Sequence, residues 1–521
     1  MITRYAPGGA VAAANHLAAA AGAVMLDRGG NAVDAAIATA AAMAVTAPHM
    51  CGLGGDLFAV VTTAGAAPAA LNASGRAGSG ADAQRLRARG VRSMPFQGEI
   101  VSVTLPGCVD GLVALQERFA SLPLEDLLGP ARHLAHDGFP VSPTLAHESL
   151  GLDGDLRARA FGRSEALIKG RRLRLPGVAR ALELVATAGR ASFYEGAVGR
   201  ALLALGGGQF TAEDLAVPQA DWVDSLSLDA FGRTLWTVPP NSQGYLALSG
   251  AWIADTVGLP DDPEDEAWAF ILVEAARQAA CDRVAVLHEH ADGASLLSAD
   301  RLGPRAAAVR DRASLLADVY GDGGTTCLCV VDRDRTGVSL IMSNGAGFGS
   351  QLLLEEHGIF LHNRGMGFSL QQGHPAEYGP RRRPPHTLSP VVVTADDGAL
   401  DTVLGTMGAD AQPQIVLQLL ARTLEAGQNA GEAIQAPRWC LSRDDLTGFR
   451  VWETDEPPIV RLEHDAPSAW AEGLQRRGYQ VARSAPGDQS FGHAQMIRVG
   501  LDDMLCGAAD PRSGDGAFVG R

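Results

Sequence analysis

Lysine is almost absent from this 521-residue chain: Lys169 is the single example, and arginine carries nearly all of the positive charge. The formal net charge is −16. Such an excess of negative charge argues against nucleic acids and anionic membranes as partners. A long apolar run is also lacking, because Asn15, His16 and Asp27 interrupt the alanine-rich stretch near the N-terminus. We therefore expect a cytoplasmic protein with no membrane partner.

Cysteine is scarce and irregularly spaced. The seven cysteines are Cys51, Cys108, Cys281, Cys327, Cys329, Cys440 and Cys506. Their spacing matches no metal-binding pattern, and their odd number does not suggest a disulfide framework. We expect no metal and no cofactor. Cys327 and Cys329 are predicted to share one face of a strand as small buried residues.

A glycine-rich segment, residues 321–324, leads directly into Thr325, Thr326 and an apolar, β-branched run. A threonine hydroxyl is a poor nucleophile unless a base lies beside it. Cleavage of the chain before Thr325 would supply that base, since a free α-amine titrates near ~8. Glycines before the cut permit the distorted backbone that an N-to-O acyl shift requires. The same pattern is also typical of an ordinary loop that enters a sheet.

Several further segments, in matching order along nearly the whole chain, decide between these interpretations. They are residues 29–36 (GGNAVDAA), 51–56 (CGLGGD), 105–107 (LPG), 137–139 (DGF), 347–349 (GFG), 436–438 (APR) and 510–513 (DPRS). With the Thr325 segment, they resemble the γ-glutamyltranspeptidase family, whose precursors cleave themselves before a catalytic threonine. The resemblance implies the four-layer αββα sandwich of N-terminal nucleophile hydrolases. It also implies a large segment, 1–324, and a small segment, 325–521, that share one core.

Hydrophobic periodicity gives a coarser description of the same fold. It predicts helices over 11–28, 31–45, 106–119, 124–136, 263–290 and 413–425. Strands are predicted over 57–63, 326–331, 338–343, 358–362, 390–394, 400–404, 493–499 and 504–506. Two groups of strands with surrounding helices indicate a layered α/β protein.

The resemblance implies roles for four residues in catalysis. Thr325 would supply both the hydroxyl and the α-amine. Ser343 stands where the family has a threonine that hydrogen-bonds to the nucleophile. Gly408 and Ala409 stand where backbone N–H groups hold the developing oxyanion, and donors of this kind are each worth ~2.7–4 kcal/mol.

The substrate-binding positions depart from the family pattern. Where γ-glutamyl enzymes have an arginine, an asparagine, a glutamine, an aspartate and a serine pair, this chain has Ser74, Gly345, Arg364, Gly367 and His386–Thr387. Most groups that would grip a free α-amino acid are therefore missing, and glutathione is not the expected substrate. Arg364, Arg76 and His386 are the candidate replacement contacts for an anion.

Several functions remain open at this stage. The leading hypothesis is a self-processing hydrolase of a small acidic amide or acyl compound. One alternative is a related enzyme that hydrolyses a C–C bond in the biosynthesis of an alkylproline-type antibiotic. Others are a true γ-glutamyltransferase or glutathione hydrolase, and a non-catalytic binding protein. The expected assembly is the two segments of one precursor, with a dimer of such heterodimers also compatible.

The first prediction concerns self-cleavage. The purified protein should run on a denaturing gel as two fragments, 1–324 and 325–521, and N-terminal sequencing of the smaller fragment should begin at Thr325. Thr325→Ala should give a full-length, inactive chain, because the hydroxyl that attacks the preceding peptide bond is gone. A small fragment that starts at any other residue would contradict the assignment.

Overall fold

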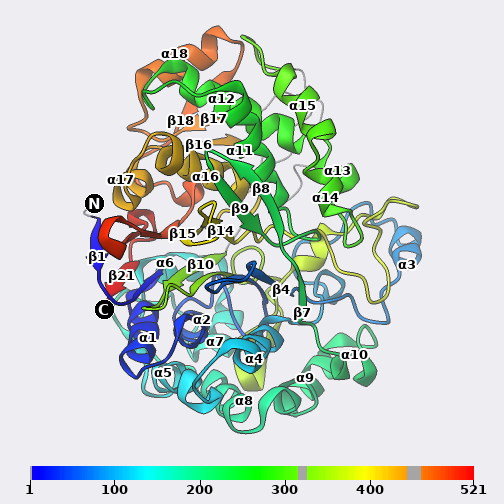
Figure 1. Cartoon of the computed structure of the whole chain (residues 1–521). Helices are drawn as coiled ribbons and strands as arrows, with labels where there is room; N and C mark the ends of the chain where they lie inside the picture. Colours follow the sequence, from blue (N-terminus) through cyan, green and yellow to red (C-terminus); the bar gives the residue numbers. More distant parts are fainter. Residues whose placement is uncertain (1–2, 315–324, 443–458) are drawn as a thin grey trace.

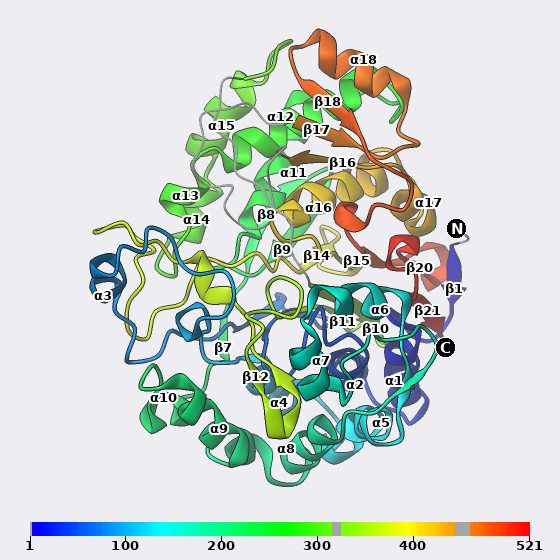
Figure 2. The same cartoon turned by 180° about the vertical axis from the view of Figure 1, so that it is seen from behind.

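The computed structural model describes residues 3–314, 325–442 and 459–521. The glycines predicted to precede the cleavage site, residues 321–324, lie outside the described residues. In the described part of the chain, two seven-stranded antiparallel sheets lie face to face. Helices cover the outer face of each sheet (Figures 1 and 2). The predicted four-layer αββα sandwich is confirmed.

Each sheet combines strands from both sides of Thr325. The first sheet has the order β1 (Arg4–Ala6), β20 (Leu505–Ala509), β19 (Gln495–Val499), β15 (Leu400–Gly405), β14 (Val391–Thr394), β9 (Arg233–Thr237) and β8 (Leu226–Ala230). The second has the order β21 (Ala517–Gly520), β2 (Ala10–Ala13), β10 (Thr326–Val331), β11 (Gly337–Ser343), β3 (Asp56–Thr62), β4 (Ala69–Ala73) and β7 (Asp221–Asp224). The segments before and after Thr325 therefore share one core.

The helices fall into two outer layers and a set of peripheral elements. One layer contains α1 (His16–Asp27), α2 (Ala32–Thr46), α4 (Cys108–Phe119), α5 (Leu124–Asp137) and α8 (Pro176–Tyr194). The other contains α11 (Tyr245–Val257), α12 (Glu266–Ala280), α15 (Ala299–Ala308) and α16 (Gln412–Leu420). Around these lie α3 (Ala83–Ala88), α6 (Pro143–Glu148), α7 (Gly154–Phe161), α9 (Ala197–Gly206), α10 (Ala212–Ala216), α13 (Arg283–Val286), α14 (Gly293–Leu296), α17 (Ala430–Gln435) and α18 (Ser468–Arg476).

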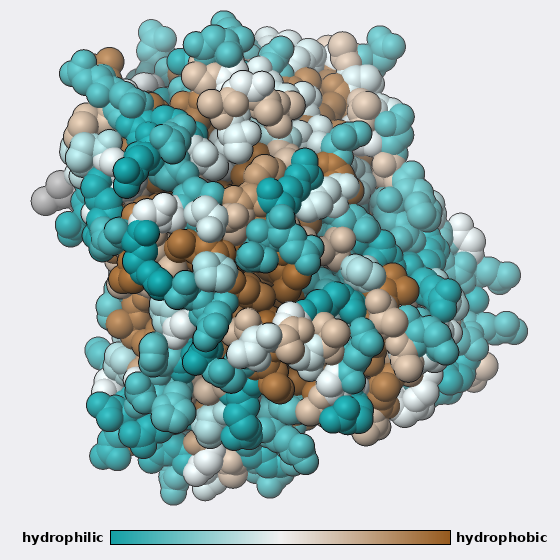
Figure 3. Space-filling view, turned by 60° about the horizontal axis from the view of Figure 1, so that its bottom comes forward, coloured by the Kyte–Doolittle hydropathy of each residue, from teal (hydrophilic) through white to brown (hydrophobic). Residues whose placement is uncertain are grey.

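Short strands complete the described architecture. They form the pairs β12 (Leu353–Leu354) with β13 (Ile359–Phe360) and β5 (Phe139–Pro140) with β6 (Arg172–Leu173), and the group β16 (Trp439–Ser442), β17 (Ile459–Leu462) and β18 (Gln480–Arg483). Strand β13 covers only part of the strand predicted at 358–362. The side chains on the face shown in Figure 3 are mostly hydrophilic, with apolar residues gathered near its centre. No helix in the described ranges is long and apolar enough to cross a membrane.

Strand β10 shows how the sequence pattern builds the core. Its side chains alternate between the two faces of the sheet, as a strand requires. Leu328 and Val330 pack toward the helices α1 and α2, whereas Cys327 and Cys329 lie between the two sheets. The prediction that these two cysteines share one buried face is confirmed.

Two predicted helices have different limits in the structure. Residues 11–13 of the predicted helix 11–28 belong instead to β2, because β2 pairs with β10 on one side and β21 on the other. Alanine has the highest helix propensity, but intrinsic propensity contributes little per residue, and strand pairing overrides it here. Asn15 then caps α1 by accepting hydrogen bonds from the backbone N–H groups of Leu17 and Ala18. The predicted helix 263–290 is interrupted after Ala280, and α13 is a separate short helix.

The second prediction tests the close packing of α1 on α2. A Cβ atom at Gly22 would lie 2.1 Å from Thr39 Oγ1 and 2.8 Å from the Ala35 carbonyl oxygen. Gly22→Ala should therefore lower the free energy of unfolding by roughly 1–3 kcal/mol, despite the higher helix propensity of alanine. Urea denaturation measures the change.

Gly151→Ala is the matched control, since a Cβ there meets no atom within 4 Å and the residue has no positive φ. This change should be neutral or stabilising by less than about 1 kcal/mol. Equal stability of the two variants would show that the helices do not approach as closely as the structure indicates.

Candidate active site

Thr325 and Ser343 lie opposite each other at the end of the β10–β11 pair. The register pairs Thr326 with Met342, which places the preceding Thr325 beside Ser343. Their hydroxyl oxygens are 3.0 Å apart, and both residues are buried. The hairpin therefore fixes a hydroxyl pair at the residue where self-cleavage is predicted.

The contacts of Ser343 determine the direction of this hydrogen bond. The backbone N–H of Gly345 donates to Ser343 Oγ at 2.8 Å, and Arg364 donates to the same oxygen at 3.0 Å. A hydroxyl oxygen accepts with two lone pairs and donates one proton. These two donors favour the arrangement in which Ser343 donates its proton to Thr325 Oγ1. A donor in this position stabilises negative charge that develops on the Thr325 oxygen.

Arg364 lies in a short 3-10 turn, Arg364–Gly367, that follows β13. Its guanidinium donates to Ser343 Oγ and to Thr387 Oγ1, each at 3.0 Å. Ser343 Oγ lies 3.0 Å from an Arg364 nitrogen and 3.0 Å from Thr325 Oγ1. The Arg364 nitrogen is therefore at most about 6 Å from Thr325 Oγ1. Burial lowers the pKa of Arg364 to about 10, so the side chain stays charged at neutral pH.

A buried carboxylate, Asp56, organises two histidines behind Arg364. His386 Nε2 lies 3.0 Å from Asp56 Oδ2, and His362 Nδ1 lies 3.7 Å from the same oxygen. Burial alone would raise the pKa of Asp56, but His362, His386 and Arg364 outweigh it and lower that pKa to about 2. Burial lowers the pKa of His386 to about 3, so His386 is neutral and donates from Nε2.

The second ring nitrogen of His386 is also engaged, since Nδ1 accepts a hydrogen bond from the backbone N–H of Leu388 at 3.3 Å. His362 Nδ1 accepts from the backbone N–H of Arg364 at 3.2 Å. His386 therefore connects Asp56 to the segment that carries Thr387, whereas His362 lies beside Asp56 and holds the backbone of Arg364. In this arrangement His386 positions the site through both ring nitrogens, and its role as an anion contact stays a prediction.

The predicted oxyanion donors, Gly408 and Ala409, lie just beyond β15. Gly405, the last residue of β15, packs closely on the Cys327 side chain, two residues after Thr325. Gly408 and Ala409 have φ angles of 132° and 45°, a sharp turn that glycine adopts readily. Gln243 Nε2 donates to the carbonyl oxygens of Ala409 at 3.0 Å and Thr387 at 3.3 Å, which ties this turn to the Arg364 side of the site.

An ion pair also lies beside the turn at Gly408 and Ala409. The carboxylate of Asp410, the residue after Ala409, lies 3.1 Å from the guanidinium of Arg283. Asp410 and Asp56 both stabilise the positive charge of Arg364, whereas Arg283 opposes it. Among the described residues, the two buried carboxylates Asp56 and Asp410 thus face the two buried guanidinium groups of Arg364 and Arg283.

Ser74 and Arg76, two predicted substrate contacts, form hydrogen bonds or ion pairs with other residues. Ser74 is buried and donates from its hydroxyl to Asn72 Oδ1 at 2.7 Å. Arg76 pairs with Asp221 at 2.6 Å on the partly exposed side of the β4–β7 edge. The structure does not place either one in contact with Thr325, Ser343 or Arg364, and their roles as substrate contacts stay predictions.

The space around Gly345 and Gly367 is too small for the side chains with which γ-glutamyl enzymes bind the amino-acid end of their substrate. A Cβ at Gly345 would lie 1.9 Å from Asn363 Oδ1, and a Cβ at Gly367 would lie 2.7 Å from the Pro385 carbonyl oxygen. Gly345 also has a φ angle of 95°. The asparagine and aspartate expected in γ-glutamyl enzymes could not occupy these positions without a shift of the backbone.

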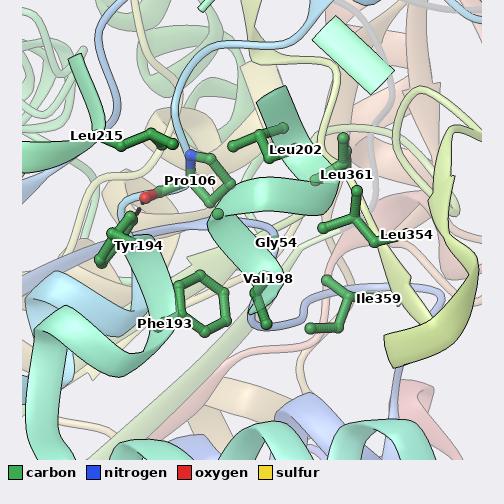
Figure 4. A pocket seen from close by; sticks show the side chains of 11 residues that line it. Gly54, Pro106, Phe193, Tyr194, Val198, Leu202, Leu215, Leu354, Ile359 and Leu361 are labelled. Atoms are coloured by element: carbon green, nitrogen blue, oxygen red, sulfur yellow. Dashed lines mark hydrogen bonds between the residues drawn. The ribbon is translucent and has the colours of Figure 1, made fainter. Parts of the chain in front are cut away.

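An apolar pocket lies behind the segment that leads to Arg364. Its lining includes Gly54, Pro106, Tyr194, Ile359 and Leu361 (Figure 4). The Tyr194 hydroxyl donates to the Pro106 carbonyl oxygen at 2.7 Å, and the backbone N–H of Asp110 donates to that hydroxyl at 3.2 Å. The pocket offers no nucleophile or charge, so its contribution is the packing that holds this segment in place.

Several residues of the site escaped the sequence interpretation, among them Asp56, His362 and Gln243. Asp56 ends the 51–56 motif that carries the family resemblance, and a carboxylate at the first position of a buried strand could have been singled out. Gln243 belongs to the polar run 241–243 after β9, whose members are all buried. Buried polar residues of this kind need partners, which is a signal for a site.

Comparison with known proteins identifies the class to which this fold and site belong. The family model described as gamma-glutamyltranspeptidase matches residues 18–520. The chain therefore belongs to the γ-glutamyltranspeptidase family, and it is an enzyme of the N-terminal nucleophile hydrolase type.

Individual relatives cover the chain almost completely. The oxamate amidohydrolase proenzyme of Klebsiella pneumoniae is 34% identical, and the glutathione hydrolase-like YwrD proenzyme of Bacillus subtilis is 33% identical; in both cases 98% of each chain is covered. The crystal structure of cephalosporin acylase from Bacillus halodurans superposes with a TM-score of 0.90 at 31% identity, over 100% of this chain and 97% of that one.

The third prediction concerns the dependence of stability on pH. Burial lowers the pKa of His49 and His386 to about 3 and that of His493 to about 4. In the unfolded chain a histidine titrates near ~6.5, so below that pH the unfolded state binds more protons. Stability should therefore be greatest above pH 6.5. It should fall toward pH 4, by up to about 1.4 kcal/mol per pH unit for each histidine.

Denaturant unfolding at pH 7.5 and pH 5 tests this dependence. His49→Gln should reduce the difference between the two conditions, whereas His290→Gln, at a side chain that is 76% exposed, should leave it unchanged. Equal stability of the wild-type protein at both pH values would contradict the buried, neutral state of these histidines.

Proposed function

We propose that this protein is a self-processing N-terminal threonine hydrolase that acts on a small amide or acyl compound bearing a carboxylate close to the scissile carbonyl. Cleavage before Thr325 produces the segments 1–324 and 325–521. The observation that carries the substrate assignment is the buried, charged Arg364 within about 6 Å of Thr325 Oγ1.

The proposed reaction follows from the contacts of Thr325. Its α-amine, freed by self-cleavage, takes the hydroxyl proton as Oγ1 attacks the substrate carbonyl. Ser343 donates a hydrogen bond to Oγ1, and the backbone N–H groups of Gly408 and Ala409 hold the oxyanion. The C–N bond then breaks, and the departing amine takes the proton from the α-amine. Water hydrolyses the ester on Thr325 by the same sequence and releases the acid.

Arg364 favours an acyl group with its own carboxylate near the attacked carbon. A guanidinium offers a planar pair of N–H donors, which suits two-point contact with a carboxylate. A long acyl chain would carry its charge beyond the reach of a side chain held this close to Ser343. An oxamate-like acyl group, in which the carboxylate is bonded directly to the carbonyl carbon, fits this limit. The name of the Klebsiella pneumoniae relative, an oxamate amidohydrolase, supports the same substrate class.

The remaining assignments have narrower support. The relatives are named as proenzymes, which supports a precursor that is processed into two segments. The cytoplasmic location, the dimer of heterodimers and the substrate contacts of Ser74, Arg76, His386 and Thr387 stay predictions.

The fourth prediction tests Arg364 as the anion contact. Oxamate and oxamide differ in that one carries a carboxylate and the other an uncharged amide at the same place. The wild-type enzyme should prefer oxamate in kcat/KM. Arg364→Met should reduce the oxamate-to-oxamide ratio by roughly ten- to a hundredfold, because a charge-assisted contact is lost. Arg364→Lys should retain part of the preference through its charge.

The ratio is informative because any general effect of Arg364 on Ser343 slows both substrates alike. Arg28→Met removes a partly exposed arginine on the far end of α1 and should leave the ratio unchanged. A γ-glutamyl anilide should be a poor substrate throughout. If Arg364→Met lowers turnover of both amides equally, Arg364 serves the nucleophile alone and the substrate assignment is wrong.

A further inference from the structure

Gln243 belongs to a segment whose backbone runs beside that of Thr387. The backbone N–H of Gln243 donates to the His386 carbonyl oxygen at 2.9 Å, and the backbone N–H of His386 donates to the Asn241 carbonyl oxygen at 2.8 Å. The hydroxyl of Thr387, the next residue, accepts a hydrogen bond from Arg364 at 3.0 Å. The backbone of Gln243 is therefore fixed to the segment that holds Arg364.

The buried side chain of Gln243 reaches from that segment to the turn at Gly408 and Ala409, which we call the oxyanion turn. Gln243 Nε2 donates to the Ala409 carbonyl oxygen at 3.0 Å and to the Thr387 carbonyl oxygen at 3.3 Å. An amide nitrogen carries two hydrogens, so both are used. The two distances together limit the separation of the carbonyl oxygens to about 6.3 Å. One amide nitrogen thus sets the spacing between the oxyanion turn and the segment that holds Arg364.

Both carbonyl oxygens have a second hydrogen-bond donor. The backbone N–H of Gln412 donates to the Ala409 carbonyl oxygen, and Ser389 Oγ donates to the Thr387 carbonyl oxygen at 3.0 Å. The backbone N–H of Ser389 also donates to Gln412 Oε1 at 3.2 Å, which joins the same two segments further along the chain. Loss of the Gln243 amide would therefore leave neither carbonyl without a partner, and the contribution specific to Gln243 is the spacing itself.

In the proposed reaction the oxyanion turn holds the carbonyl oxygen of the acyl group, and Arg364 holds its carboxylate. The spacing of these two supports must then match the length of the acyl chain, because catalysis requires both ends to be held in one geometry. We propose that Gln243 is a positioning residue that fixes this spacing and restricts the enzyme to acyl groups whose carboxylate is bonded directly to the scissile carbonyl carbon. The inference rests on the proposed hydrolysis of acidic amides.

The test compares oxamate, malonamate and succinamate, three monoamides whose carboxylate is separated from the amide carbonyl by no, one and two methylene groups. The wild-type enzyme should have its highest kcat/KM with oxamate. Gln243→Met removes the N–H donors and keeps the length of the side chain. It should lower the ratio of kcat/KM for oxamate to that for succinamate at least tenfold, mainly through a higher KM for oxamate.

Gln418→Met is the matched control. Gln418 is also buried, and its Nε2 likewise donates to two backbone carbonyl oxygens, those of Gln414 at 3.0 Å and Trp439 at 2.9 Å. This change should lower stability and leave the substrate ratio unchanged. Both variants should still cleave themselves before Thr325, which a denaturing gel shows. If Gln243→Met does not, Gln243→Asn provides the same comparison, since its amide is one methylene too short to reach both carbonyl oxygens.

The outcomes separate this inference from the proposed function. If the wild-type enzyme hydrolyses none of the three monoamides, the proposed function fails and the inference fails with it. If it prefers oxamate and the Gln243 variants keep that preference, the proposed function stands and Gln243 does not set the acyl length. A wild-type preference for succinamate would also contradict the inference. Equal changes of the ratio in the Gln243 and Gln418 variants would show a general loss of rigidity instead of a specific spacing.

Discussion

The hydroxyl of Ser343 is the contact on which the rest of this site depends. Two N–H donors, from Gly345 and Arg364, favour donation of its proton to Thr325 Oγ1. The same oxygen thus connects the nucleophile, the turn after β11 and the side chain assigned to the substrate carboxylate. Loss of any one donor would free a lone pair on Ser343 and allow the hydrogen bond to Thr325 to reverse its direction.

The fold provides this geometry through strand register and close packing. Strand β11 pairs with β10 on one side and β3 on the other, which brings Ser343 opposite Asp56 as well as beside Thr325. Asp56 then reaches the histidines that carry the Arg364 and Thr387 segments. A Cβ on Gly54 would lie 2.2 Å from the Phe360 carbonyl oxygen, so the segment before Arg364 runs directly against the 51–56 motif. Buried polar networks of this kind fix one arrangement because a broken contact leaves an unsatisfied group.

Sequence reasoning predicted much of this architecture and part of the site. The strands predicted at 326–331 and 338–343 are present as β10 and β11, and the family resemblance predicted the contact between Ser343 and Thr325. The family resemblance supplied the four layers. Periodicity failed at β2, because an alanine-rich strand and an alanine-rich helix look alike until the pairing partners are known. The ion pair of Arg76 with Asp221 and the hydrogen bond between Asp56 and His386, 330 residues away, depend on tertiary contacts that no local pattern encodes.

The central claim is that Thr325 Oγ1 attacks a carbonyl whose neighbouring carboxylate is held by Arg364. Intact-mass spectrometry of an acid-quenched reaction with oxamate tests it most directly. The account predicts that the 325–521 fragment gains the mass of an oxalyl group and that peptide mapping places this group on Thr325. An oxalyl group on any other residue, or turnover with the Thr325→Ala chain at the wild-type rate, would contradict it.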